Sequence, residues 1–320
     1  MGNKRRTPAT RLVTLGGLVA LVTLTVSGCS TDEVLRFGWP EGVTPQAMRM
    51  RDFWTWSVVA SLIVGVIVWA LILWPVIAHR KKGDTLPRQF QYNHFLEIIY
   101  TGIPSIIVVV LFYFTVVTQD YVLAEEKDPD IRVNVTAFQW NWDFQYESYK
   151  DGSGATVVPE TDDGLVHTVG SSVEIPLLVL PTKSQIHYEI RARDVIHSFF
   201  VPEFHFKRDV FPYPEKNNQD NTFQNSIDRE GSFVGRCAEL CGTYHSGMNF
   251  EVRALNLERF DRYMTLRRAE NPDTQELYTA AEALAKLGEE DPDCGELCSP
   301  RAVTTAPFNT DRTARTSSGE

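Results

Sequence analysis

Two long apolar runs, at residues 53–77 and 95–118, constrain what this 320-residue chain can fold into more than any other feature. The first run carries only neutral residues, and the second carries a single charge, Glu97, near its start. A helix of about 20 apolar residues spans the hydrocarbon core of a bilayer, so each run is long enough to cross a membrane. We therefore assign transmembrane helices to residues 53–78 and 95–118.

The loop between the two runs, residues 79–94, is basic. It opens with the segment His79-Arg80-Lys81-Lys82 and also holds Arg88. The positive-inside rule places such a loop in the cytoplasm, so both ends of the mature chain lie outside. We expect a two-pass protein of the cell membrane whose C-terminal part is extracytoplasmic. The helical hairpin has too little polar content to form a channel on its own.

The N-terminus is typical of a signal peptide, assigned to residues 1–28. Basic residues precede an apolar stretch from Leu12 to Val26, which leads into Ser27-Gly28-Cys29. Small residues directly before a cysteine resemble a bacterial lipobox, which would make Cys29 the lipidated first residue of an extracytoplasmic segment, residues 29–52. The alternatives are an ordinary signal with an incidental cysteine and an uncleaved membrane anchor.

From residue 119 the composition becomes globular, with turn residues between short runs rich in Val, Ile, Phe and Tyr. Residues 138–147 alternate aromatic and polar side chains, which predicts a strand with its rings on one face. Further strands are expected at residues 173–180, 184–192 and 250–255. We predict an antiparallel β-sandwich over residues 119–267, then an extension, residues 268–320, with a helix near 273–287 and a disordered end.

The segment from Cys237 to Met248 places two thiols, an imidazole and a thioether within twelve residues. Thiolate, imidazole and thioether together are the soft ligand set that selects copper, and two cysteines four apart on one loop can place both sulfurs between two metal ions. His197 is the candidate for a further ligand from an upstream loop. A disulfide is the common alternative for exported cysteines, and a zinc site would leave Met248 without a role.

These residues, written Cys237-x-Glu239-x-Cys241-x3-His245-x2-Met248 with His197 upstream, resemble the copper-A site of cytochrome c oxidase subunit II, in the aa3-type haem-copper oxidases. The resemblance implies a cupredoxin-like fold. It also implies that the two cysteines bridge two coppers, that each histidine binds one copper, that Met248 is a weak axial ligand and that Glu239 supplies its backbone carbonyl. The carboxylate of Glu239 is then a ligand of a magnesium or manganese ion shared with subunit I.

The function implied by the resemblance is that of the electron-accepting subunit of a proton-pumping terminal oxidase. Electrons pass from cytochrome c through copper A to haem a in subunit I, where haem a3 and copper B reduce oxygen to water. Subunits I and III are the implied membrane partners, and the chain is an enzyme only as part of this cytochrome-c oxidase. Two other hypotheses are a membrane-anchored copper carrier and the copper-free subunit of a quinol oxidase.

Two further residues receive roles from the resemblance. The motif Gln139-Trp140-x-Trp142 makes Trp140 the residue at which electrons enter from the docked cytochrome, whereas core packing is preferred for Trp142, Phe144 and Tyr146. The motif Glu97-x3-Thr101-x2-Pro104 places Glu97 at the entrance of a proton pathway into subunit I. The alternative for Glu97 is a helix-start carboxylate favoured by the helix dipole.

Charge and cysteine spacing complete the sequence-based expectations. Residues 119–320 hold 35 acidic and 20 basic side chains, which would attract a basic electron carrier and exclude nucleic acid as a partner. The lipobox, a polar insertion at residues 150–172 and the extension resemble the form found in high-GC Gram-positive lineages. The resemblance implies a supercomplex with a cytochrome bc1 complex, because the oxidase of these lineages is often joined to one, and the cytochrome c domain of that complex replaces a soluble carrier. Cys294 and Cys298 repeat the four-residue spacing without a following histidine or methionine, so we expect a disulfide.

Overall fold

The computed structural model describes residues 30–304 except for 82, 85, 87, 163, 172 and 173, so the signal peptide, Cys29 and residues 305–320 lie outside the described part. Its contacts divide the chain into two units. Among the described residues, the first contains 30–41 and 51–107, and the second contains 42–50 and 108–304.

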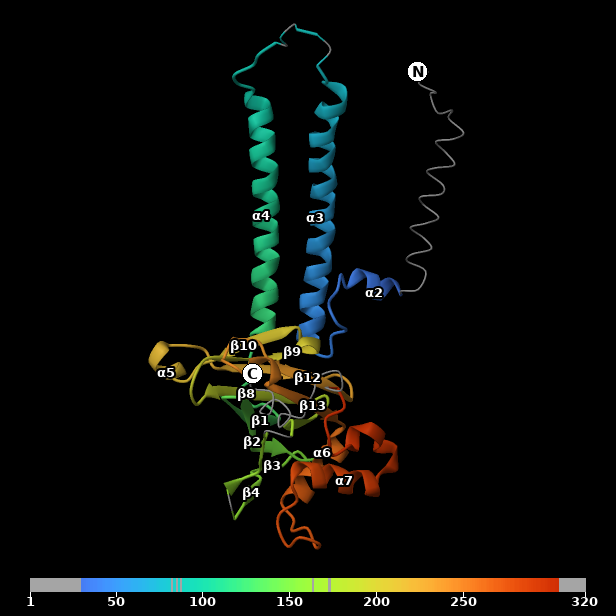
Figure 1. Ribbon diagram of the computed structural model, residues 1–320, viewed down its shortest axis with the longest axis vertical. Helices are drawn as coiled ribbons and strands as arrows, with labels where there is room; N and C mark the ends of the chain where they lie inside the picture. Colours follow the sequence, from blue (N-terminus) through green and yellow to red (C-terminus); the bar gives the residue numbers. More distant parts are fainter. Residues whose placement is uncertain are drawn as a thin grey trace, which may run out of the picture. The chain divides into compact units, whose positions relative to one another are not determined.

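Two helices contain the predicted membrane spans (Figure 1): α3 (Pro45–Ala78) and α4 (His94–Val122). Helix α3 begins before the apolar run because the Thr44 hydroxyl accepts the N–H of Ala47, a typical N-cap. Within each helix the most apolar window has no buried side chain, as expected of helices whose surroundings are lipid. A short helix, α2 (Thr31–Leu35), precedes them.

The second unit contains a β-sandwich of two sheets (Figure 1). One sheet has the order β11-β8-β1-β2-β3 with β6 also paired to β2, and the other has the order β10-β9-β12-β13-β7. The strands of the first sheet are β1 (Ile131–Phe138), β2 (Asn141–Lys150), β3 (Thr156–Val157), β6 (His167–Val169), β8 (Gln185–Ala192) and β11 (Thr222–Ser226). Those of the second are β7 (Leu177–Pro181), β9 (His197–Val201), β10 (Phe206–Val210), β12 (Gly231–Cys237) and β13 (Asn249–Leu255).

The sandwich differs from the expected antiparallel one in two strand pairs. Strand β1 pairs with β8, and β13 with β7, in parallel. Parallel neighbours need a long connection, and in both pairs the chain passes through other strands before it returns. The fold class itself, a two-helix hairpin followed by a cupredoxin-like β-sandwich, is confirmed.

The aromatic strand predicted over residues 138–147 is interrupted. Phe138 pairs with Asn141 at the ends of β1 and β2, so Gln139 and Trp140 form a two-residue turn between them. Trp140 therefore does not share the inner face with the other rings. Trp142, Phe144 and Tyr146 are fully buried in the core, as predicted.

After the sandwich, α6 (Leu257–Arg267) ends the domain predicted over residues 119–267, and the extension follows with α7 (Ala280–Glu290) and the 3-10 helix η3 (Pro292–Cys298). Helix α7 begins at Ala280, seven residues later than predicted, because Thr279 and Glu282 form a capping box there. Cys294 and Cys298 are joined by a disulfide.

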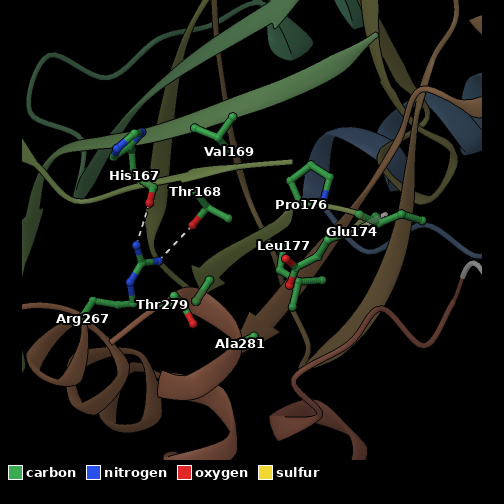
Figure 2. A pocket seen from close by; sticks show the side chains of 11 residues that line it. His167, Thr168, Val169, Glu174, Pro176, Leu177, Arg267, Thr279 and Ala281 are labelled. Atoms are coloured by element: carbon green, nitrogen blue, oxygen red, sulfur yellow. Dashed lines mark hydrogen bonds between the residues drawn. The ribbon is translucent and has the colours of Figure 1, made fainter. Parts of the chain in front are cut away.

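The insertion and the extension contact each other. Figure 2 shows Arg267 of α6 donating to the Thr168 hydroxyl, at 2.9 Å, and to the His167 carbonyl, at 2.6 Å. The same guanidinium also donates to the carbonyl of Tyr278, just before α7. One buried arginine of α6 thus ties strand β6 of the insertion to the segment of the extension just before α7.

The described chain has one further hairpin, β4 (Glu160–Thr161) with β5 (Gly164–Leu165), and a one-turn helix, α5 (Pro214–Asn217). Another 3-10 helix, η1 (Pro202–Phe204), joins β9 to β10. The last, η2 (His245–Gly247), lies in the loop between β12 and β13.

Candidate metal centre

Three adjacent strands bring the predicted copper ligands to one end of the second sheet. Strand β9 begins at His197, and β12 ends at Cys237. The two strands pair there, with Cys237 opposite Phe199. The loop after β12 then returns to the sheet at Met248, directly before β13, and the N–H of Cys237 bonds to the carbonyl of Met248 at 3.0 Å. Residues forty positions apart therefore become neighbours.

The donor atoms of the predicted ligands lie within a few ångströms of one another. The Sγ atoms of Cys237 and Cys241 are 3.7 Å apart. The Nδ1 atom of His197 lies 3.8 Å from Cys237 Sγ, and the Nδ1 atom of His245 lies 3.5 Å from Cys241 Sγ. Each sulfur therefore has its own imidazole, an arrangement that suits two metal ions side by side.

Two weaker donors complete the set. The carbonyl oxygen of Glu239 is 3.2 Å from Cys237 Sγ. The Met248 thioether sulfur is 3.8 Å from Cys241 Sγ and is fully buried. The structure thus brings all six predicted copper donors together.

The residues fit a copper pair better than the disulfide alternative. Cys294 and Cys298 have the same spacing and are joined by a disulfide, whereas Cys237 and Cys241 are free thiols. The pair without a disulfide, Cys237 and Cys241, is the one surrounded by imidazoles and a thioether. Thiolate, imidazole and thioether are ligands that copper accepts together.

The two thiols have different acidities. Burial raises the pKa of Cys237, but hydrogen bonds from His197 and from backbone N–H groups outweigh it and lower the pKa to about 7. Burial and the neighbouring Cys237 thiolate raise the pKa of Cys241 to about 12. A second thiolate beside the first therefore requires positive charge, which metal ions supply.

Asp194, which was not among the predicted site residues, fixes the orientation of His197. Its Oδ1 atom lies 2.8 Å from His197 Nε2, which leaves Nδ1 directed toward Cys237. Its Oδ2 atom accepts the N–H of Gln139 at 2.7 Å. Metal-ligating histidines usually donate their second ring N–H to such a carboxylate. The signal was present in the sequence as an aspartate three residues before the histidine.

The Gln139–Trp140 turn contacts the ligand loop directly. The indole Nε1 of Trp140 and the amide of Gln139 both donate to the carbonyl of Cys241, at 3.0 and 2.8 Å. The edge of the Tyr244 ring lies against the indole, with 4.9 Å between centroids. Gly242 has φ +117 and would place a Cβ 3.1 Å from the Trp140 ring, so only glycine suits this close approach.

The other two candidate residues lie in different surroundings. The Glu239 side chain is 44% exposed and lies 3.9 Å from Lys207 Nζ. Glu97, at the start of α4, accepts the N–H of Asn93 at 2.9 Å and lies 3.3 Å from His94 Nδ1. The contacts of Glu97 are those of a helix-capping carboxylate, the alternative considered for this residue.

Replacing Asp194 with alanine is expected to weaken copper binding by about 10- to 100-fold, the usual cost of losing the carboxylate behind a ligating histidine. The measurement is copper retention by the full chain in competition with a chelator. Asp220→Ala is the matched control, because that carboxylate pairs with Arg208 and touches no candidate ligand. Equal retention by parent and Asp194→Ala would contradict the role of Asp194.

Comparison with known proteins yields matches along most of the chain. The family model described as the periplasmic domain of cytochrome c oxidase subunit II matches residues 131–255, and that of its transmembrane domain matches residues 33–116. The chain is 49% identical to the probable cytochrome c oxidase subunit 2 of Nocardia farcinica, over 95% of this chain and 90% of that protein. It is 45% identical to cytochrome c oxidase subunit 2 of Mycobacterium tuberculosis, over 94% and 90%.

A solved structure is also similar. The periplasmic domain of subunit II of the cytochrome oxidase of Bradyrhizobium japonicum matches with 23% identity and a TM-score of 0.33, over 43% of this chain and 93% of that domain.

Proposed function

This chain belongs to the cytochrome c oxidase subunit II family, and on that basis we propose that it accepts electrons from cytochrome c at a dinuclear copper-A centre and passes them to haem a of subunit I. As a family member it is subunit II of a haem-copper oxidase, anchored in the membrane by two helices with an extracytoplasmic domain. The observation that carries the proposal is the pair of free thiols 3.7 Å apart, each with its own imidazole.

The proposed role of the ligands follows from their positions. Cys237 and Cys241 would bridge the two coppers, with His197 and His245 each binding one. Met248 would be the weak axial ligand, and the Glu239 carbonyl the last donor. Two coppers that share one unpaired electron through bridging thiolates change little in geometry between redox states.

The protein around His197 and Met248 shields these two ligands from water and fixes their positions. His197 and Met248 are fully buried, and the indole N–H of Trp142 reaches the carbonyl of Met248 at 3.4 Å. The rings of Trp142 and His197 lie 6.4 Å apart. Burial among aromatic rings controls solvent access, which is one of the means by which proteins set the potential of a metal centre. Buried donors also disfavour the copper-carrier hypothesis, because a carrier needs an exchangeable site.

Trp140 is proposed as the residue through which electrons enter. Its partly buried ring is linked by one hydrogen bond to the carbonyl of Cys241, so a short route leads from the indole to a bridging sulfur. The acidic balance of residues 119–320 supports a basic donor, either cytochrome c or a cytochrome c domain of a bc1 complex.

The remaining assignments rest on the family pattern. We propose a magnesium or manganese ion shared with subunit I at the carboxylate of Glu239, and a proton-pathway entrance at Glu97. Subunits I and III are the proposed membrane partners, with haem a, haem a3 and copper B held in subunit I. Residues 1–28 as signal peptide and Cys29 as lipid attachment site are proposals that lie outside the described residues.

Replacing Trp140 with leucine in the assembled oxidase is expected to lower kcat/KM for reduced cytochrome c by about tenfold or more, equivalent to about 1.4 kcal/mol of transition-state free energy. Copper content and the copper spectrum should stay unchanged, because the indole is not a ligand. The control is Tyr213→Leu, an exposed ring on another loop. A Trp140→Leu oxidase that turns over at the parent rate would contradict the proposed route.

A further inference from the structure

Two charged side chains of β13, Glu251 and Arg253, are fully buried. Side chains alternate along a strand, and Phe250, Val252 and Ala254 point into the core of the sandwich. Glu251 and Arg253 therefore occupy the opposite face of the sheet. Charges withdrawn from water are costly unless they are paired and hydrogen-bonded, so something must cover and satisfy them there.

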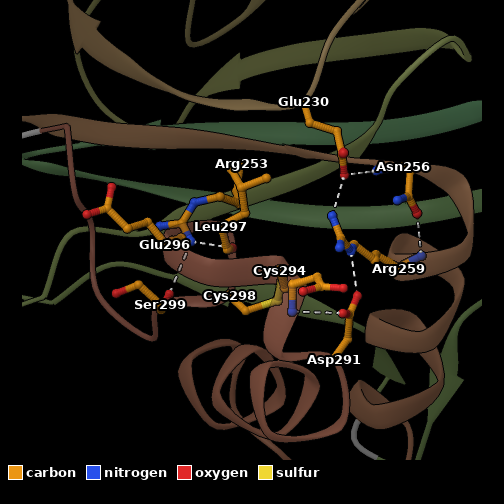
Figure 3. Close-up of a disulfide and its surroundings, with 11 residues drawn as sticks. Glu230, Arg253, Asn256, Arg259, Asp291, Cys294, Glu296, Leu297, Cys298 and Ser299 are labelled. Carbon is orange, nitrogen blue, oxygen red and sulfur yellow. Dashed lines mark hydrogen bonds and ion pairs between the residues drawn. A yellow bond between two sulfur atoms is a disulfide. The ribbon is translucent and has the colours of Figure 1, made fainter.

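The two side chains pair with each other, with Arg253 Nη2 2.5 Å from Glu251 Oε1, and their other partners come from the end of the extension. Figure 3 shows the guanidinium of Arg253 reaching this segment. It donates to the carbonyls of Glu296, Leu297, Ser299 and Arg301 at 2.5 to 3.2 Å. The other carboxylate oxygen of Glu251 accepts the N–H groups of Val303 and Thr304 at 2.8 Å and the Thr304 hydroxyl at 2.6 Å.

The segment that supplies these partners, residues 291–304, is here called the strap. Its first part, residues 291–298, is held by contacts that do not involve β13. The Cys294–Cys298 disulfide closes the turn that holds two of the four carbonyls, those of Glu296 and Leu297, and Gly295 allows that turn with φ +54. At its start, Asp291 accepts from Arg259 Nε at 2.7 Å, and Arg259 also pairs with Glu230, the residue before β12. The strap is therefore anchored at both ends against the second sheet.

Strand β13 connects the strap to the ligands. It begins at Asn249, directly after Met248, and it pairs with β12, which ends at Cys237. Glu251 is only three residues from the thioether ligand. Any loosening of β13 would therefore move Met248 relative to the sulfur of Cys241, 3.8 Å away.

We propose that the strap holds β13 in place for the copper centre, and that Glu251 and Arg253 are positioning residues for Met248. The inference rests on the proposed function only in taking Met248 as a copper ligand. The strap also gives the extension a role within this chain, because it supports the strand that begins directly after the last ligand, Met248.

The test compares the full chain with a variant truncated after Glu290 that also carries Glu251→Thr and Arg253→Thr. The threonines remove both buried charges together, so the uncovered strand face is compatible with water. The expected result is at least tenfold faster copper release to a chelator, a changed copper spectrum in the folded fraction, and faster amide hydrogen exchange at residues 249–255. A second variant, Arg253→Lys, keeps the charge but cannot bind four carbonyls and should shift the same readouts less.

The control is Arg262→Ala, which breaks the exposed Arg262–Glu290 pair of the extension without touching β13. The inference would be overturned if both strap variants released copper and exchanged amide hydrogens at the parent rates, with the copper spectrum unchanged. It would also be overturned if Arg262→Ala changed these readouts as much as the strap variants do. A parent chain that binds no copper pair would instead contradict the proposed function. Hydrogen exchange in the metal-free chain then still decides whether the strap holds β13.

Discussion

Replacing Cys241 with serine is expected to abolish the dinuclear copper centre and, in the assembled oxidase, electron transfer from cytochrome c. The Sγ atom of Cys241 lies 3.7 Å from Cys237 Sγ, 3.5 Å from His245 Nδ1 and 3.8 Å from Met248 Sδ. A hydroxyl is a hard, weakly acidic donor and cannot replace a bridging thiolate for copper. The measurement is copper per chain together with the electron paramagnetic resonance spectrum of the variant.

The control for Cys241→Ser is Ser246→Ala, an exposed side chain of the same loop that is not among the six donors. It should retain two coppers and the parent spectrum. A Cys241→Ser chain that still binds two coppers with the parent spectrum would show that Cys241 is not a bridging ligand.

Replacing Arg253 with alanine is expected to lower the free energy of unfolding of the extracytoplasmic domain by about 3–5 kcal/mol, the usual cost of removing one partner of a buried ion pair. The substitution leaves the Glu251 carboxylate buried beside an empty space and removes the donor to four strap carbonyls. Because domains are stable by only about 5–15 kcal/mol, this is a large fraction of the total. Urea unfolding of the full chain in detergent, followed by tryptophan fluorescence, measures it.

Arg262→Ala serves as the control for Arg253→Ala, because Arg262 pairs with Glu290 at the surface, with the two side chains 45% and 32% exposed. A surface pair of this kind contributes less than about 1 kcal/mol. If the free energy of unfolding falls by a similar amount in both variants, the buried Glu251–Arg253 pair stabilises the domain no more than a surface pair does.

The membrane helices and most of the copper donors could be predicted because the residues that define them lie close together in the sequence. An uninterrupted apolar run has few outcomes other than a membrane span. Two thiols, an imidazole and a thioether within one loop likewise restrict the metal. His197 could be named as a candidate from an upstream loop, but its place beside Cys237 could not be predicted, since nothing local shows that β9 and β12 pair there.

The features that were missed depend on partners distant in the sequence. Residues 138–147 were predicted as one strand, because alternation alone does not show that Gln139 and Trp140 form a turn. Within the strand predicted over residues 250–255, nothing in the sequence shows that Glu251 and Arg253 are buried, since their partners lie 43 to 53 residues further along. Helix α7 was predicted to begin too early because the acidic, helix-compatible residues before Thr279 form a turn held by the Glu270–Leu277 bridge.

The most direct test of the copper-A proposal is the electron paramagnetic resonance spectrum of the full chain, purified in detergent with its thiols reduced and then loaded with copper. We predict two coppers per chain and hyperfine splitting from two equivalent copper nuclei, the signature of one electron shared across both bridging thiolates. A spectrum from a single copper, or no signal with Cys237 and Cys241 joined as a disulfide, would contradict the account.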